Sequence, residues 1–210
     1  MKHEWRKKEK SIYIPSNQPE VITLPPYQFV TIKGAGNPNT ELFGDHIQAL
    51  YAVSYAIKMT LKKTEIQPKN YTDWTVYPLE GIWDITDEAK DNFNGTINKD
   101  DLVYELMIRQ PNFISLDYFN EMLEVTKTKK GFKLLDKVAF QEIAEGRCIQ
   151  AMHLGPYDTE PETFAKMETF AQRQNLERAS KSHREIYLSD FRKVPAEKLK
   201  TTLRFRLKNS

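Results

Sequence analysis

Glu185 and Tyr187 are the residues of this sequence best suited to chemistry, because they stand two positions apart in the strand-like segment 183–190. Side chains alternate between the faces of a strand, so His183 and Ser189 are expected on the same face, with the intervening apolar residues packed in the core. A carboxylate desolvated beside a phenol can pair with a cationic ligand, or take a proton from water as a general base. The alternative is a solvated carboxylate that pairs with the adjacent arginine or another neighbour.

Aromatic residues elsewhere in the chain are candidates for the walls of such a site, although aromatic residues at these spacings more often form core. The candidate walls are Trp74, Tyr77, Trp83, Tyr51, Tyr55 and Phe191. Trp83 is favoured because it follows Glu80 and Gly81, and a glycine in a strand can mark a bulge or a close approach of ligand to backbone. Glu80 is a second candidate acid, but strict alternation places it on the opposite face from Trp83.

His153 stands just before Gly155-Pro156-Tyr157, where it is expected to act as an ordinary hydrogen-bonding or packing residue, or to orient Tyr157 or a water. Cys148 lies in an apolar run and is interpreted as a small core residue rather than a nucleophile. The histidines are scattered, and no metal-binding spacing, phosphate loop or serine elbow is present. We therefore predict no metal and no cofactor.

Two similar successions of strands and helices carry these residues. In the first half, the expected elements are strands within 19–34, a helix over 40–59, strands over 75–85 and 101–110 joined by a polar loop, and a helix over 115–128 capped by Ser115. In the second half, they are strands within 139–154, a helix over 160–175, and strands over 182–189 and 200–208.

The repeated order predicts an α+β fold made of two β-α-β-β modules with antiparallel sheets, related by a pseudo-twofold axis. The seam between such modules is a natural place for a central ligand groove. The predicted organisation is an N-terminal arm (1–18), a first β-α-β-β half (19–112), a connecting helix (113–135) and a second β-α-β-β half (136–210).

Composition favours a globular protein, since 40% of the 210 residues are hydrophobic and 29% are charged. No apolar run is long enough to span a membrane, the charged first residues do not resemble a secretory signal, and the single cysteine suits a reducing compartment. We therefore expect a cytoplasmic protein. A net charge of +2 gives no support for nucleic-acid binding. The basic ends, 2–10 and 198–208, are interpreted as a solvated arm and a charged strand face.

Several of these motifs together resemble the GyrI-like small-molecule-binding proteins. The resemblance rests on His153-x-Gly155-Pro156-Tyr157, on the segment His183-Arg-Glu-Ile-Tyr-Leu-Ser-Asp190, and on Tyr77-Pro-Leu-Glu-Gly-Ile-Trp83 as a first-half counterpart. It covers about residues 19–208. It implies a tandem of β-α-β-β modules flanking a groove, as in effector-binding halves of multidrug-sensing regulators, gyrase-inhibitory proteins, and stand-alone proteins that hydrolyse cyclopropane-bearing alkylating compounds.

The resemblance also implies roles for individual residues. In the drug-sensing members a buried glutamate on the late second-half strand meets cationic ligands, and Glu185 is the matching position. In the hydrolytic members a glutamate and aromatic residues carry the chemistry, which implies Glu185 with Tyr157 or Tyr187. The chain departs from the family in having Phe191 where proline is frequent, and its extended segment 71–135 is more like the stand-alone members.

These observations lead to four hypotheses of function, which belong to different classes of protein. A hydrolase that opens cyclopropanoid rings and a non-catalytic protein that binds or senses drugs rank equally, with a flat, lipophilic, aromatic or cationic ligand in either case. A gyrase-modulating interaction protein ranks below them. A transcription regulator ranks last, because the 18-residue arm is too short for a DNA-binding domain. Neither a membrane nor a direct nucleic-acid partner is predicted, and the oligomeric state is not predicted.

Overall fold

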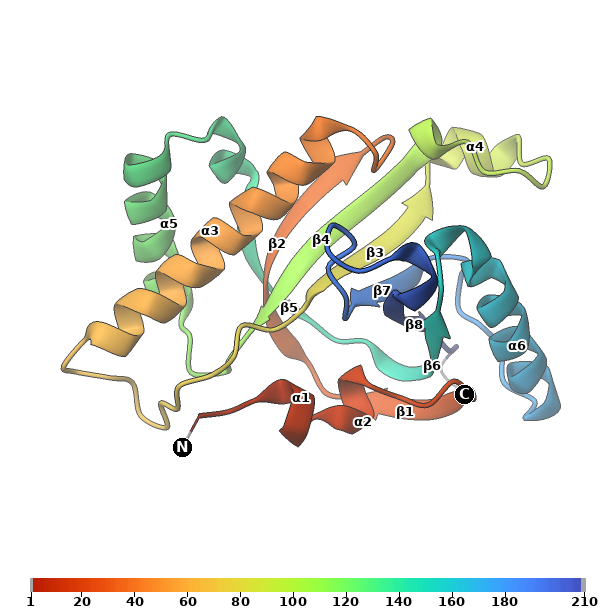
Figure 1. Ribbon diagram of the computed structural model, residues 1–210, viewed down its shortest axis with the longest axis horizontal. Helices are drawn as coiled ribbons and strands as arrows, with labels where there is room; N and C mark the ends of the chain where they lie inside the picture. Colours follow the sequence, from red (N-terminus) through yellow and green to blue (C-terminus); the bar gives the residue numbers. More distant parts are fainter. Residues whose placement is uncertain (1, 209–210) are drawn as a thin grey trace. The chain divides into compact units, whose positions relative to one another are not determined.

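The structure is a computed structural model, and it describes residues 2–208. The chain divides into two compact units (Figure 1). The first unit comprises the residues up to Glu4, Tyr27–Leu79 and Trp83–Ile143. The second comprises Trp5–Pro26, Glu80–Ile82 and the chain from Ala144 onward. Each is a mixture of helices and antiparallel strands, so the predicted α+β class is confirmed.

The first unit is built on strands in the order β3-β4-β2-β5, with β3 shared between the units. The bounds are β2 (Tyr27–Ala35), β3 (Leu79–Ile85), β4 (Leu102–Gln110) and β5 (Ala139–Ile143), and both partners of β2 run antiparallel to it. Helix α3 (Glu41–Lys63) crosses β2 and β4, and α5 (Leu116–Lys130) packs beside α3 (Figure 1). The short elements are α4 (Asp87–Asp91), η1 (Lys99–Asp101) and η2 (Lys133–Lys137).

Local sequence signals account for the helices of this unit. The apolar stripe of α3 repeats at helical spacing, and Leu50, Val53 and Ile57 are completely buried. Helix α5 begins where predicted, because the Ser115 hydroxyl accepts the backbone N–H of Tyr118 at 3.1 Å. It ends at Gly131, whose left-handed φ of 66° suits a residue without a side chain.

The second unit is built on strands in the order β1-β6-β8-β7-β3, and β1–β6, β6–β8 and β7–β8 are antiparallel pairs. The bounds are β1 (Glu20–Leu24), β6 (Gly146–Leu154), β7 (His183–Tyr187) and β8 (Lys200–Arg206). Helix α6 (Glu160–Arg173) packs on β6, and its Met167 is buried against Ile149 and Leu203 in the core of this unit. The turns η3 (Tyr157–Thr159) and η4 (Ala196–Lys198) complete it.

The predicted repetition is confirmed in the order of elements: β1-β2-α3-β3-β4 is followed, after α5, by β5-β6-α6-β7-β8. The pairing of the first strand of each half differs from the predicted grouping. Strand β1 pairs with β6 in the second unit, and β5 pairs with β2 in the first. The predicted strand 75–85 begins only at Leu79, and the predicted loop after it contains α4.

The expectation of a solvated N-terminal arm is wrong. Residues 5–13 form two short helices, α1 (Trp5–Lys8) and α2 (Lys10–Tyr13), in which Trp5 and Tyr13 are buried with ring centroids 5.2 Å apart. The Thr202 hydroxyl donates to the Tyr13 carbonyl at 2.7 Å, and the Arg204 guanidinium donates to that of Ile12 at 2.6 Å. The arm is therefore held to β8 by side chains that donate hydrogen bonds to its backbone carbonyl groups.

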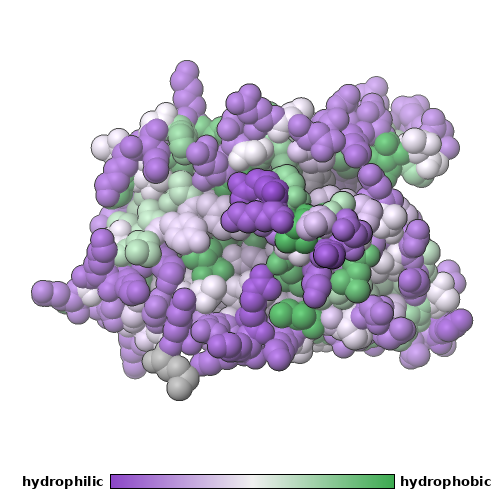
Figure 2. All heavy atoms as spheres, viewed as in Figure 1, coloured by the Kyte–Doolittle hydropathy of each residue, from purple (hydrophilic) through white to green (hydrophobic). Residues whose placement is uncertain are grey.

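The core and the surface are those of a globular protein, as the composition predicts. Cys148 is buried as predicted, and burial raises the pKa of its thiol to about 12, which suits an inert core residue. Hydrophilic side chains cover most of the face seen in Figure 2. Within residues 2–208, no helix combines the length and the apolar character needed to cross a membrane.

Gly34 of β2 is expected to be intolerant of a side chain. A Cβ atom there would overlap the ring of Tyr104, which is held by edge-on packing against Phe43 and by a 3.2 Å hydrogen bond to His46. We expect Gly34→Ala to lower the free energy of unfolding by about 1–3 kcal/mol in urea denaturation. Gly44→Ala is the matched control, because its Cβ meets open space in α3 and should stabilise by about 0.5–1 kcal/mol. Equal effects at both glycines would contradict this packing.

Candidate functional site

Strand β7 presents the candidate acid on the face predicted from alternation. Arg184 and Ile186 are buried on one side of the strand, whereas Glu185 and Tyr187 are half-buried on the other. Arg184 is not the partner of Glu185, since its guanidinium forms ion pairs with Glu80 and Glu145 instead. Of the two pairings in that alternative, Glu185 forms the one with another neighbour, His183, and not the one with the adjacent arginine.

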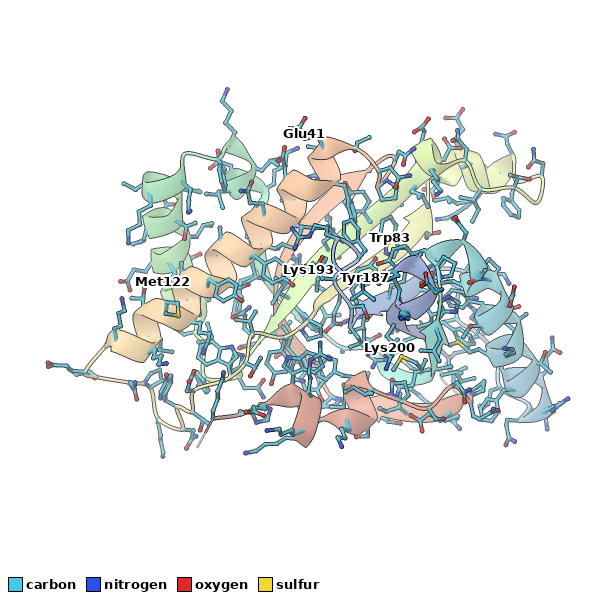
Figure 3. The ribbon with its side chains drawn as sticks, viewed as in Figure 1. Glu41, Trp83, Met122, Tyr187, Lys193 and Lys200 are labelled. Atoms are coloured by element: carbon cyan, nitrogen blue, oxygen red, sulfur yellow. The ribbon has the colours of Figure 1, made fainter. Side chains whose placement is uncertain are left out.

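The two strand neighbours of Glu185 bracket its carboxylate. The Tyr187 hydroxyl donates to Oε2 at 2.8 Å, and His183 Nε2 donates to Oε1 at 3.1 Å. Tyr187 is labelled in Figure 3. Only 12% of the Glu185 side chain is exposed. Strand alternation produces this arrangement, because residues two apart project side by side from one face.

Glu160, the first residue of α6, completes the group and was missed by sequence reasoning. Its carboxyl group is hydrogen-bonded to that of Glu185, and only 5% of Glu160 is exposed. Burial, and then the negative charges of Glu185 and Asp158, raise the pKa of Glu160 well above its usual value. Glu160 is therefore easier to protonate than an exposed glutamate. Its other oxygen, Oε1, is buried without a hydrogen-bond partner.

Tyr157 adds an aromatic ring and a hydroxyl. It lies in η3, and its ring meets that of Tyr187 edge to face, with centroids 6.0 Å apart and an interplanar angle of 88°. Burial and the nearby charge of Glu185 raise the pKa of its phenol to about 12. Tyr157 therefore remains a hydrogen-bond donor at neutral pH rather than a base.

His153 fastens the turn that carries Tyr157. Its Nδ1 lies 2.9 Å from the Thr163 hydroxyl, and its Nε2 lies 3.0 Å from the Pro156 carbonyl, to which it donates. Gly155, between them, has a φ of 126° that disfavours any other residue. Both ring nitrogens are engaged, so His153 serves as a hydrogen-bonding residue of the turn between β6 and α6.

The remaining sequence candidates in the second unit lie outside this group. Glu80 is only 2% exposed, and it accepts a hydrogen bond from Arg184 Nη1 at 2.6 Å. Burial raises the pKa of Glu80 even though Arg184 opposes that shift, so we interpret Glu80 as part of a buried ion-pair network. Phe191 follows β7 in a turn and is 56% exposed.

Three predicted wall residues belong to the first unit. Trp83 is buried against Phe43 and Tyr104, with ring centroids 5.7 and 5.1 Å away. Trp74 is buried in another aromatic cluster. Tyr55 is 49% exposed on α3. Trp83 and Trp74 serve as core residues of their unit.

The described part of the chain, residues 2–208, contains no cluster of three histidine, cysteine or acidic side chains able to hold a metal ion. The donors and acceptors of the group around Glu185 are carboxyl, hydroxyl and imidazole groups. This set is suited to proton transfer and to pairing with an organic cation.

Comparison with known proteins gives close structural similarity to proteins from Listeria innocua. An uncharacterized conserved protein is 34% identical, with a TM-score of 0.86, and covers 98% of this chain and 100% of its own. A hydrolase from the same organism is 34% identical, with a TM-score of 0.87, over 99% of this chain and 100% of its own. The C-terminal domain of EcmrR, at 12% identity and a TM-score of 0.52 over 95% and 99% of the two chains, shares the fold.

No curated protein matches the chain in sequence. The model of the GyrI-like small molecule binding domain, in contrast, matches residues 17–208, which is nearly the whole chain. This match and the identity to the Listeria proteins agree with the motifs at His153–Tyr157 and His183–Asp190. The chain therefore belongs to the family of GyrI-like small-molecule-binding domains.

Proposed function

We propose that this protein binds flat lipophilic or cationic compounds at the group around Glu185, and that it hydrolyses cyclopropanoid-type toxic electrophiles there with Glu185 as the general base. One observation carries the proposal: the Glu185 carboxylate, of which little is exposed, is oriented by hydrogen bonds from Tyr187 and His183. A carboxylate held in this way has a defined direction of approach for a cation or for a water molecule.

Aromatic side chains support binding. Tyr157 and Tyr187 meet edge to face beside the carboxylate, so a flat ligand finds both apolar surface and the negative face of a ring. Burial of apolar surface contributes about 25 cal/mol per Å², which makes ring contact the main source of affinity for a lipophilic compound. The carboxylate then selects for positive charge.

The hydrolytic step follows from the same groups. The oxygen of a water molecule attacks the strained, electrophilic ring carbon and forms the C–O bond, while Glu185 takes a proton from that water. The ring C–C bond breaks, and its electron pair moves onto the conjugated oxygen of the substrate. Tyr157, which keeps its proton, donates a hydrogen bond to that developing oxyanion. The hydrolases from Listeria innocua, 33–34% identical to this chain, support a hydrolytic role.

A second candidate function is binding or sensing of drugs without turnover. It is favoured by the hydrogen bonds to Glu185, because Tyr187 and His183 occupy one carboxylate oxygen each. An oxygen that already accepts a hydrogen bond is less available to a water molecule, whereas the carboxylate still presents negative charge to a bound cation.

Mass spectrometry separates the two functions. The protein is incubated with a cyclopropane-bearing alkylating compound. The molecular mass of the recovered compound is then compared with that of a sample kept with heat-unfolded protein. We expect the compound to gain one water faster with the folded protein. A compound that is retained in equilibrium dialysis but recovered unchanged in mass would exclude hydrolysis and leave binding as the function.

A further inference from the structure

The segment 87–101, between β3 and β4, is exposed and acidic, and we call it the acidic segment. It contains α4 and η1, and every residue from Lys90 to Asp100 is exposed. Five acidic residues stand in it against two lysines. Phe93 is 54% exposed and Ile97 56%, although the burial of either side chain would be favourable. Large apolar side chains exposed among charged ones are typical of a surface that contacts another protein.

The segment 127–137, which ends α5 and contains η2, is basic, and we call it the basic surface. Five lysines stand in it against one acidic residue, Asp136. The exposed lysines are Lys129, Lys130, Lys133 and Lys137. The helix dipole favours lysines in the last turn of α5, but two of these four lie beyond the end of the helix. Phe132 and Leu134 are half-buried among them, so the surface complements the acidic segment in charge and resembles it in apolar character.

Both segments lie toward the same end of the strands of the first unit. The acidic segment ends just before β4, where Val103 is opposite Ala35, the last residue of β2. The basic surface ends just before β5, where Ala139 is opposite Thr31 of the same strand. Because β2 lies between β4 and β5, the two segments stand on either side of it. In Figure 1, α4 and the end of α5 lie at opposite ends of one edge of this unit.

We propose that this edge is an interface between two copies of the chain, in which the acidic segment of each copy binds the basic surface of the other. A second copy is the partner because the chain itself carries both complementary surfaces. A twofold axis between them engages both at once, which gives a closed dimer with two equal contacts. The two segments offer about 25 residues of each copy, within the roughly 20–30 residues a side of a stable interface.

The proposed dimer is sensitive to salt. Phe93 and Ile97 provide apolar area, whereas the charges steer association and fix the orientation of the two copies. Salt screens exposed charges, so the dissociation constant should rise by about tenfold or more between about 50 and 500 mM sodium chloride. Sedimentation equilibrium of the natural protein measures it. A protein that remains monomeric at about 100 µM in low salt would overturn the proposal, whatever else its lysines bind.

Exchange of the charges is the sharper test, and it uses three variants. The acid-reversed variant carries Glu88→Lys, Asp91→Lys and Asp100→Lys. The lysine-reversed variant carries Lys129→Glu, Lys130→Glu and Lys133→Glu. Each set inverts the sign of its own segment, so that both surfaces of one variant carry the same charge. The control variant reverses three exposed acids outside both segments, through Glu65→Lys, Glu162→Lys and Glu197→Lys.

Each reversed variant alone should be monomeric in low salt, because like charges meet at both contacts. An equimolar mixture of the two should form dimers again, since every contact then joins opposite charges. The control variant should associate as the natural protein does. A reversed variant that dimerises with the natural affinity would overturn the proposal. A mixture that stays monomeric, although circular dichroism shows both variants folded, would overturn it as well.

Cross-linking of the natural protein gives a result that needs no variant. Isotope-labelled and unlabelled protein are mixed in high salt and returned to low salt, and a carbodiimide then joins carboxylates to lysines in contact. We expect mass spectrometry to find peptides of segment 87–101 joined to peptides of segment 127–137 in isotopically mixed pairs. Mixed pairs that join only other segments, or the absence of mixed pairs, would contradict the interface. The proposal concerns only the first unit, so neither result bears on the function proposed for Glu185.

Discussion

Glu185→Gln is expected to lower the rate of cyclopropanoid hydrolysis by about 10²–10⁴-fold, the usual contribution of a positioned general base. The amide cannot take a proton from water, yet its carbonyl oxygen can still accept the hydrogen bond from Tyr187 that the carboxylate accepts at 2.8 Å. The fold of the strand is therefore expected to persist. The measurement is the initial rate of water addition, followed by mass spectrometry at saturating substrate.

Glu162→Gln supplies the comparison, because it makes the same chemical change at an exposed position of α6 and should leave the rate unchanged. Circular dichroism of both variants establishes that each is folded. Turnover by Glu185→Gln at the rate of the natural protein would remove Glu185 from the role of base.

Glu145→Gln is expected to lower the free energy of unfolding by about 3–5 kcal/mol, the range observed when one partner of a buried ion pair is removed. Glu145 is buried between two arginines: its Oε2 accepts from Arg204 Nη1 at 2.7 Å, and its Oε1 lies 3.0 Å from Arg184 Nε. The amide leaves both guanidiniums short of a negative charge in an interior that water does not reach. Guanidinium chloride denaturation at neutral pH measures the change.

The pH dependence of the free energy of unfolding is an independent check on the contribution of Glu145. Burial alone would raise the pKa of Glu145, but Arg184 and Arg204 bring it below its usual value of 4.5. The stability from this carboxylate is thus fully present above pH 4.5 and is lost as the pH falls through the lowered pKa. The free energies of unfolding of the natural protein and of Glu145→Gln should therefore converge in acid. Exposed Glu142 provides the control, and Glu142→Gln should change stability by less than about 0.5 kcal/mol. A comparable loss at both positions would contradict the role of the network.

Alternation and helix signals predicted the parts of the site that are local in sequence. The face of β7 that carries Glu185 and Tyr187 follows from a period of two, and the beginning of α5 follows from the side chain of Ser115. The order of strands and helices was predictable for the same reason. Each of these features depends on residues within one turn or one strand.

Contacts between distant segments could not be predicted in the same way. Glu160 lies 25 positions before Glu185, and at the sequence level it is simply the acidic first residue of a helix. Alternation places Arg184 on the same face as apolar residues, but its buried partner Glu80 is 104 positions away in the sequence. Hydrophobic alternation in β1 and β5 is compatible with several antiparallel partners, so their pairing with β6 and β2 needed the structure.

The most direct measurement is a crystal structure of the protein with N-methylquinolinium bound. The expected result is a ring nitrogen within about 6 Å of the Glu185 carboxylate, the range over which opposite charges interact strongly, with the flat ring against Tyr157 or Tyr187. A cation seated elsewhere, with Glu185 still engaged only by Glu160, His183 and Tyr187, would contradict the account.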